Sequence, residues 1–297
     1  MKVEKTKRTK PARSNSVSKS DEERTIFWRS SLLPGVDFFK ATFSDHVYSR
    51  HTHGEYAIGV TERGAQVFHC RGAARLAPPS SFSLINPEEP HDGRSATGHD
   101  YSYRMMYVDP NALLRLSDRN GIGMQSSSQF PLFLSPIVED PMLAADYLSL
   151  HQGLEAGWLG RLETESRMLA LLIGLVTRHA DQRTVAPVRR HSPLVRSIRE
   201  YLEAHFHEDP SLTELSEVTG VNRFSLMRQF TREVGLPPHG YLTQVRLRAA
   251  RFSLLSGKPP AQVAAEVGFV DQSHLIKRFR SAFGITPGQY VSAESSR

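Results

Sequence analysis

The chain has 297 residues, 39% of them hydrophobic and 23% charged, which is enough for two domains and typical of a globular protein. The single cysteine, Cys70, excludes an intramolecular disulfide framework and a cysteine-rich zinc site. The formal net charge of +6 is unevenly distributed, since residues 1–19 carry seven lysines and arginines against one acidic residue.

Residues 1–23 contain almost no large apolar side chains, so they cannot bury enough surface to offset the entropy lost on ordering. We expect a disordered basic tail, which is either a solvated leader or an arm that binds phosphate nonspecifically. The charged N-terminus lacks the apolar segment of a secretory signal, and no apolar stretch matches the length of a bilayer span. We therefore expect a cytoplasmic protein that does not associate with membranes.

Between residues 26 and 108, short apolar segments alternate with turns that contain glycine or proline. The segments are residues 56–60, 66–70, 81–85 and 101–108. Short strands at regular spacing are typical of an antiparallel sandwich or barrel. Neither a glycine-rich nucleotide-binding motif nor a G-x-S-x-G element occurs here, so nucleotide-binding and hydrolase functions lose their usual support.

Three helices are predicted to follow, over residues 110–118, 140–155 and 160–180. The third is amphipathic, with apolar residues such as Leu162, Leu169 and Leu172 spaced by three or four positions. We expect residues 24–180 to form one domain that self-associates as a homodimer through these helices. The alternative is that the third helix packs on its own barrel. The polar stretch 181–193 is predicted to be a linker.

The C-terminal third has the pattern of a helix-turn-helix unit. A first helix is predicted over residues 194–207, and Ser211 with Glu214 forms a capping box that opens a second, short helix. Gly220 ends this helix, and Asn222 caps a third helix that extends to Val234. Two short helices joined by a tight turn with glycine are typical of a DNA-binding unit.

The third helix has two distinct faces at 100° per residue. Its apolar face holds Leu226, Met227, Phe230 and Val234, and its opposite face holds Phe224, Ser225, Arg228 and Arg232. An apolar face opposite one with two arginines and an aromatic ring is suited to a helix that enters the major groove. The alternative is an ordinary solvated surface.

The same plan recurs about fifty residues later. Residues 259–269 predict a short helix that ends at glycine, and Asp271 opens another helix. Its outward residues are Gln272, Ser273, His274, Lys277 and Arg280. The connecting helix, residues 241–256, carries apolar stripes on two sides, one of which includes Phe252, so we expect it to lie between two partners. Counted as roughly 18 residues at 1.5 Å each, the spacer between the two units spans about 27 Å, which lets one chain reach two successive major grooves.

Residues 194–290 resemble the DNA-binding domain of the AraC/XylS transcription regulators. The motifs that carry this resemblance are Leu226-x-Arg228-x-Phe230, Gly235-x-x-Pro238, Arg246-Leu247-x-x-Ala250, Gly268-Phe269-x-Asp271-Gln272-Ser273-His274, and Phe283-Gly284-Ile285-Thr286-Pro287-x-x-Tyr290. The resemblance implies binding to double-stranded promoter DNA and contact with RNA polymerase as an activator. The sequence alone does not separate activation from repression. Ser225, Leu275 and Lys277 depart from the family pattern, which affects base preference rather than fold.

Polar, chemically versatile residues cluster in the predicted barrel at His51, His53 and Glu55, with His91 further along the chain. On a strand, the first three alternate onto one face. The spacing resembles the first motif of the cupins, and regulators of this family carry a cupin-like barrel that binds a small effector.

We favour an effector pocket without metal, formed by these four residues. Two alternatives stay open. The cluster could bind a metal ion, since two or three histidines and a carboxylate suit zinc, iron or manganese. The histidines could also have a structural role only. Tyr101, Tyr103, Met105 and Tyr107 alternate onto one face and either line the pocket or pack in the core.

The second cupin motif lacks its usual glycines, and a fused DNA-binding domain makes a sensor role sufficient. We therefore expect a non-enzymatic regulator with no cofactor. Its predicted fold is α+β in two domains: a cupin-like β-barrel with trailing helices, then an all-α double helix-turn-helix over residues 194–297.

Overall fold

A computed structural model describes residues 24–292, apart from residues 97, 99, 114–130 and 182–190. The predicted basic tail and most of the predicted linker lie outside the described residues. Of the helix expected over residues 110–118, residues 110–113 are helical and the remainder lies outside the described part.

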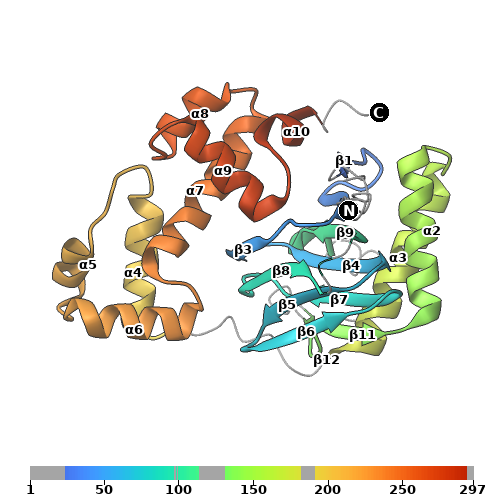
Figure 1. Ribbon diagram of the computed structural model, residues 1–297, viewed down its shortest axis with the longest axis horizontal. Helices are drawn as coiled ribbons and strands as arrows, with labels where there is room; N and C mark the ends of the chain where they lie inside the picture. The colour runs from blue at the N-terminus through green and yellow to red at the C-terminus, as the bar shows by residue number, and fades with distance from the viewer. Residues whose placement is uncertain (1–23, 97, 99, 114–130, 182–190, 293–297) are drawn as a thin grey trace, which may run out of the picture.

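The N-terminal half is a β-barrel built from two antiparallel sheets (Figure 1). In spatial order, the six-stranded sheet contains β1 (Arg24–Arg29), β2 (Val36–Phe43), β9 (Tyr101–Val108), β4 (Tyr56–Arg63), β7 (Ser81–Ile85) and β11 (Ile137–Glu139). The four-stranded sheet contains β3 (Tyr48–His51), β8 (His91–Ser95), β5 (Gln66–Cys70) and β6 (Ala73–Ala77). A short pair joins β10 (Leu132–Phe133) to β12 (Ala180–Asp181). The predicted barrel is confirmed.

Two helices, α2 (Pro141–Ala156) and α3 (Arg161–His179), cover the outer face of the six-stranded sheet. Asp140 caps α2 by accepting a hydrogen bond from the Leu143 amide at 3.1 Å. The buried face of α3, which includes Met168, Leu171 and Leu175, packs with α2 and the sheet in one apolar cluster. Most of the apolar surface of α3 is therefore used inside its own domain.

The C-terminal third is entirely helical in the residues that the structure describes. Its first unit contains α4 (Pro193–Ala204), α5 (Leu212–Thr219) and α6 (Arg223–Val234), and its second contains α8 (Pro260–Glu266), α9 (Gln272–Phe283) and α10 (Pro287–Ser292). Helix α7 (Pro238–Leu255) joins the two units and contributes to both cores, with Leu242 in the first and Leu254 in the second. The expected partner on each side of α7 is confirmed, but Phe252 is 76% exposed, so its assignment to a packed stripe is wrong.

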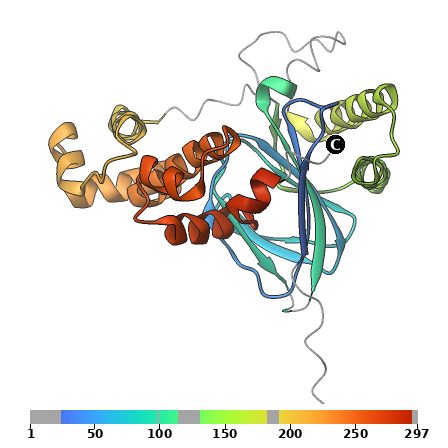
Figure 2. The same ribbon diagram turned by 90° about the horizontal axis from the view of Figure 1, so that it is seen from above.

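The second unit rests directly on the barrel: α9 packs against β3, and α10 packs against β1 (Figures 1 and 2). Gly284, which ends α9 with a φ of +73°, makes this close approach feasible, because a Cβ there would overlap the Tyr48 hydroxyl of β3. Core residues of the second unit and of the barrel interior accordingly form one continuous cluster. Among the described residues, every helix is too short or too polar to span a membrane.

Candidate functional site

Three histidines meet at the end of the barrel that faces the second helix-turn-helix unit. His51 ends β3 and His91 begins β8, and the two residues are paired across the sheet. Their ring centroids lie 4.3 Å apart, and the His53 ring lies 4.9 Å from that of His91. The structure thus brings together the three histidines that the sequence singled out.

The prediction that strand alternation brings these residues together is wrong. Strand β3 ends at His51, so His53 and Glu55 do not alternate on a strand. They lie on the connection to β4, where the chain bends at Gly54 and Glu55. Both side chains still line the same cavity as His51, because this connection folds over the barrel mouth.

Each histidine is anchored by its Nδ1 atom to a main-chain carbonyl oxygen two residues away. The distances are 2.8 Å from His51 to Ser49, 2.7 Å from His53 to Glu55 and 2.9 Å from His91 to Glu89. Because a carbonyl oxygen only accepts, Nδ1 carries the proton and Nε2 keeps its lone pair. Burial lowers the pKa of His51 and His91 to about 3 and that of His53 to about 4, so all three are neutral near pH 7.

Two small cavities meet at this cluster. One, of about 40 Å³, lies inside the barrel and is lined by His51, His91, Tyr103, Met105 and Tyr107, among others. The other, of about 20 Å³, lies between the barrel and the second unit. Its lining combines His51, His53, Glu55 and Tyr107 of the barrel with Arg251, Phe283, Ile285 and Tyr290 of the C-terminal helices. His51 and Tyr107 line both, so the histidines lie between barrel interior and domain interface.

Of the predicted tyrosine face, Tyr103, Met105 and Tyr107 line the inner cavity. Tyr101 instead stacks on Tyr103, with ring centroids 5.8 Å apart, and is fully buried in the core. The stripe therefore serves both packing and pocket lining.

An ion-pair network closes the domain interface at Arg251 of α7. Its guanidinium donates to Glu55 Oε1 at 2.9 Å and to Asp37 Oδ2 at 3.4 Å, and its Nε donates to the Tyr290 hydroxyl at 3.1 Å. Asp37 also pairs with Arg29 at 3.1 Å. These side chains are about one-fifth exposed, so water screens the network only partly.

The charges in this network perturb one another. Burial raises the pKa of Asp37 despite the nearby guanidinium groups of Arg29 and Arg251. Burial also opposes ionisation of Glu55, but Arg251 and His53 outweigh it and hold the pKa of Glu55 below its usual range. Glu55 is therefore an ionised carboxylate next to the histidines.

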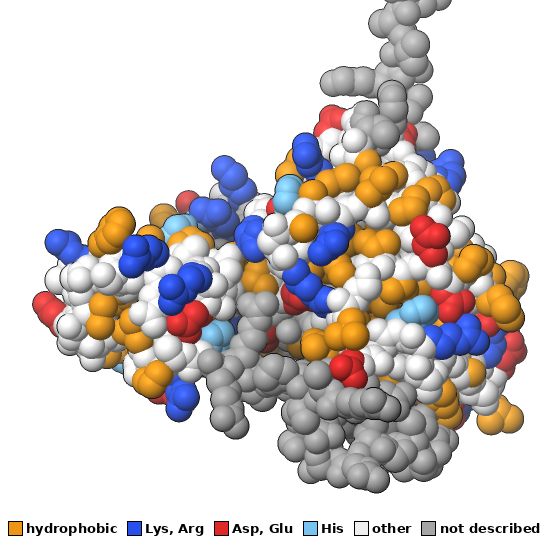
Figure 3. Space-filling model, turned by 90° about the horizontal axis from the view of Figure 1, so that it is seen from below, with side chains coloured by type: hydrophobic (Ala, Val, Ile, Leu, Met, Phe, Trp, Pro, Cys, Tyr) orange, Lys and Arg blue, Asp and Glu red, His pale blue; other side chains and the backbone are white. Residues whose placement is uncertain are grey.

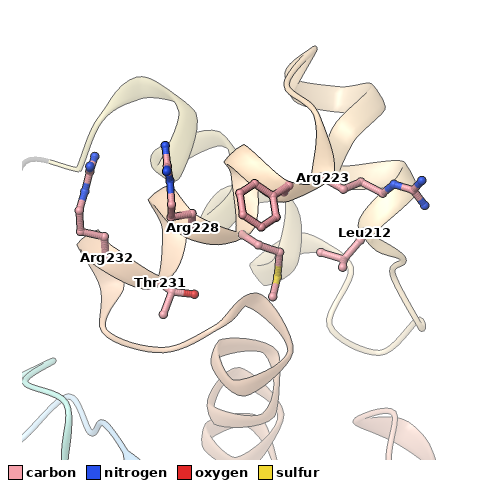
Figure 4. A pocket seen from close by; sticks show the side chains of 7 residues that line it. Leu212, Arg223, Arg228, Thr231 and Arg232 are labelled. Carbon is pink, nitrogen blue, oxygen red and sulfur yellow. The ribbon is translucent and has the colours of Figure 1, made fainter.

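A second candidate site is the outward surface of the first helix-turn-helix unit. The predicted capping box is present, since Glu214 N donates to Ser211 Oγ at 3.2 Å, and Asn222 caps α6 by accepting from Ser225 N at 3.0 Å. Arg228 and Arg232 extend side by side from α6, and Arg223 points away at its other end (Figure 4). Lysine and arginine side chains are frequent on this lobe, at the left of Figure 3.

Exposure on α6 follows the predicted faces except at Met227, which was assigned to the apolar face but is only half-buried and lines a surface groove with Phe224 and Arg228. Leu226, Phe230 and Val234 are buried, whereas Phe224 is 76% exposed. Ser225 is half-buried next to the cap. Together with Leu212 and Met227 the Phe224 ring lines an apolar surface groove bordered by arginines, which is typical of a contact surface.

In the second unit, Asp271 caps α9 by accepting from His274 N at 2.7 Å. Gln272, Ser273, Lys277 and Arg280 are exposed. His274 is less available than the sequence suggested, because its ring packs edge-on against Phe269 and its Nε2 accepts from Arg278 Nε at 3.2 Å.

Sequence reasoning singled out Glu55 but missed its interface partners Arg251 and Asp37. Arg251 and Asp37 lie more than two hundred positions apart, so no local pattern connects them. Arg223, which lines the same groove as Arg228, was also missed, although a basic residue next to a helix cap is a usable signal.

Two family models match the chain. An AraC-like ligand binding domain matches residues 33–172, and a helix-turn-helix domain matches residues 215–293. Both matches agree with the two parts seen in the fold.

Similar proteins include the "Uncharacterized HTH-type transcriptional regulator YbfI" of Bacillus subtilis (strain 168), 30% identical over 228 residues that make up 77% of this chain and 81% of that protein. The HTH-type transcriptional regulator MtrA of Neisseria gonorrhoeae is 34% identical over 83 residues, 27% of each chain. Among solved structures, ToxT from Vibrio cholerae O395 has a TM-score of 0.54 at 10% identity, and the match covers 89% of this chain and 99% of ToxT. At that identity the likeness concerns the fold alone.

Proposed function

The chain belongs to the AraC/XylS family of DNA-binding transcription regulators, which are not enzymes. From this premise we propose that a small effector controls its sequence-specific binding to promoters. The effector binds among His51, His53, Glu55 and His91. The observation that carries this proposal is the place of the histidine cluster. The cluster lies where the barrel contacts the helices that would bind DNA.

Contacts from both recognition helices support a direct route from the pocket to DNA. Arg50, next to His51, donates to the Gly235 carbonyl oxygen at the end of α6 at 3.1 Å. Ser49 donates to the Ser281 carbonyl oxygen near the end of α9 at 3.3 Å. A ligand that displaces this strand therefore shifts the C-terminal ends of both helices.

The small size of the cavities supports a conformational response. Pockets that hold organic ligands usually have volumes of about 300 Å³ or more, whereas these measure about 40 and about 20 Å³. An organic effector must therefore displace the second unit from the barrel mouth in order to enter. Opening this interface is the step that would pass the signal to the DNA-binding helices.

On DNA, the proposal assigns base contacts to the exposed starts of α6 and α9. Arg228 is suited to a bidentate contact with guanine, and Phe224 to a thymine methyl group or a sugar. Lys277 is a point charge without a planar fork, which suits a phosphate contact. Arg232, Ser225, Gln272, Ser273, His274 and Arg280 complete the proposed surface.

The proposal includes a domain division and an assembly. Residues 24–180 form the effector-binding unit, residues 181–193 the linker and residues 194–297 the DNA-binding unit. Leu162 at the start of α3 is 78% exposed and Trp158 just before the helix is 73% exposed, so large apolar side chains are available there for self-association as a homodimer. Activation by contact with RNA polymerase in the cytoplasm also belongs to the proposal.

Genome-wide mapping of bound DNA tests the function, because it yields both the target sites and the neighbouring genes that suggest the effector's chemistry. Affinity of the full-length protein for a mapped site is then measured with the candidate effector, in the wild-type protein and in His51→Ala and His91→Ala. We expect the variants to keep basal DNA affinity and to lose the response. A normal response in folded variants would remove the cluster from the effector site.

A further inference from the structure

The three histidines present a set of donor atoms with the arrangement of a metal site. One ring nitrogen from each of His51, His53 and His91 can be chosen so that the three nitrogens all lie within 4.8 Å of one another. Zinc–nitrogen bonds of 2.0–2.1 Å in tetrahedral geometry place ligand nitrogens about 3.3 Å apart. Small side-chain adjustments, of about 1.5 Å at most, close that difference.

The tautomers suit metal binding as well. All three histidines donate Nδ1–H to a backbone carbonyl oxygen, which leaves each Nε2 as an electron-pair donor. An outer-sphere hydrogen bond of this kind orients most histidine ligands in metalloproteins.

One of these nitrogens has no partner within the described part of the chain. His53 is 4% exposed, and its Nε2 is buried and makes no hydrogen bond. A buried polar atom without a partner costs about 1–3 kcal/mol. The adjoining cavity of about 20 Å³ has room for a water molecule or an ion but not for an organic molecule.

A carboxylate lies at the same cavity, but the DNA-binding unit holds it. Glu55 lines the cavity together with His51 and His53, and its Oε1 accepts from Arg251 Nη1 at 2.9 Å. Three imidazoles and one carboxylate form a donor set that binds divalent transition-metal ions. The residue that would complete this set is thus the one that ties α7 to the barrel.

We propose that His51, His53 and His91 bind a divalent transition-metal ion through Nε2, and that Glu55 exchanges from Arg251 to the ion as its fourth ligand. This inference rests on the proposed function and deepens it, because the ion is then the effector. When Glu55 turns to the ion, Arg251 keeps Asp37 and Tyr290 but loses its shortest ion pair to the barrel. Metal binding and docking of α7 therefore compete for one carboxylate, and by linkage each weakens the other.

Titration of the metal-free full-length protein with Zn²⁺ and Co²⁺ tests the site, with calorimetry for affinity and Co²⁺ absorption for geometry. We expect one ion per chain, and the intense visible bands of tetrahedral Co²⁺. His53→Ala should weaken binding at least a hundredfold, whereas the exposed control His207→Ala should bind like the wild type. Failure of the wild-type protein to bind at micromolar concentration, or equal affinity in a folded His53→Ala variant, would overturn the site.

Two further variants test the exchange of Glu55. Glu55→Gln should bind the ion about tenfold more weakly and change the Co²⁺ spectrum, and Arg251→Ala should bind it about tenfold more tightly because Glu55 is released. If both variants match the wild type in affinity and spectrum, Glu55 does not exchange and the inference is overturned.

The affinity for a mapped promoter site, measured with Zn²⁺ and with a chelator, separates this inference from the proposed function. We expect the ion to change wild-type affinity at least fivefold and to leave that of Glu55→Gln unchanged. Specific DNA binding that ignores the ion overturns the metal inference alone, whereas loss of specific binding under both conditions overturns the proposed function.

Discussion

Replacing Arg251 with alanine should loosen the contact between the barrel and the second helix-turn-helix unit. The change removes the guanidinium that pairs with Glu55 at 2.9 Å and with Asp37 at 3.4 Å. Asp37 keeps Arg29 at 3.1 Å, but Glu55 loses its ion-pair partner.

The expected magnitude follows from the exposure of these groups. Breaking a fully buried pair costs about 3–5 kcal/mol and a surface pair about 0–1 kcal/mol. Arg251, Asp37 and Glu55 are 19–23% exposed, which places the loss in docking free energy at about 2 kcal/mol. Since 1.4 kcal/mol is a factor of ten, the undocked population should rise about thirtyfold.

The matched control is Arg248→Ala, a substitution one turn earlier on the same helix. Arg248 pairs with Glu88 at 2.8 Å, but the two side chains are 34% and 38% exposed, so we expect a loss below about 1 kcal/mol. Helix propensity and backbone position are nearly the same in the two variants. A difference between them therefore measures the buried network.

Hydrogen exchange followed by mass spectrometry reports the docked population at individual segments. In Arg251→Ala, amides of β3 and of the segment from Gly284 to Tyr290 should exchange about thirtyfold faster, while those of the central strand β9 stay unchanged. Rates within threefold of the wild type at both interface segments would refute the assignment of Arg251 as the main tie between the domains.

Arg228→Ala should cost about 1–3 kcal/mol of DNA-binding free energy and relax specificity at one base pair, which affinities for single-base variants of a mapped site would reveal. Equal loss on every variant would show that Arg228 only positions the helix. Lys277→Ala should weaken all sequences equally and lower the salt slope by about one unit, as seen in a salt titration. Burial lowers the pKa of the three clustered histidines, and of His151 in the buried face of α2, to about 3 to 4. Their pKa is 6.5 when unfolded, so the unfolded chain takes up protons first below pH 6.5. The free energy of unfolding should fall by about 1 kcal/mol per histidine from pH 7 to 5.5, and a denaturation midpoint that does not move with pH would contradict this. Leu162→Glu should turn a dimer into a monomer in sedimentation at tens of micromolar, and a wild-type monomer under these conditions would argue against self-association through α3.

Patterns that are local in sequence predicted most of the fold. The strands 66–70, 81–85 and 101–108 match β5, β7 and β9 because a run of apolar or alternating residues is enough to define a buried strand. The caps at Ser211 and Asn222 marked the starts of α5 and α6 because their side chains satisfy free helix amides.

Strands that carry polar side chains escaped prediction. β8 has the sequence HDGRS, whose buried positions are a histidine and a glycine rather than aliphatic residues. β6 is short, and its polarity alternates the wrong way, since Arg75 is half-buried whereas Leu76 is 56% exposed. Hydrophobic periodicity carries no signal where the buried face of a strand serves a polar pocket.

The histidine cluster was predicted by residue type, but its surroundings were not. His53 and Glu55 converge with His51 through a bend after the strand rather than through strand alternation. Arg251 was not predicted because ion pairs between domains depend on how the domains dock, and docking leaves no mark at fixed sequence spacing. Phe252, beside it, has the apolar character of a packed residue, yet α7 leaves it exposed.

If the barrel controls sequence-specific DNA binding through its contact with the second unit, the affinity of the full-length protein for DNA must depend on both the sequence and Arg251. This affinity is measured for a genomically mapped site and for a scrambled sequence, in the wild type and in Arg251→Ala. We expect at least a thousandfold preference of the wild type for the mapped site at physiological salt, and a change of tenfold or more in that affinity in the variant. Equal affinity for both sequences, or a variant that binds the mapped site like the wild type, would contradict control by the barrel.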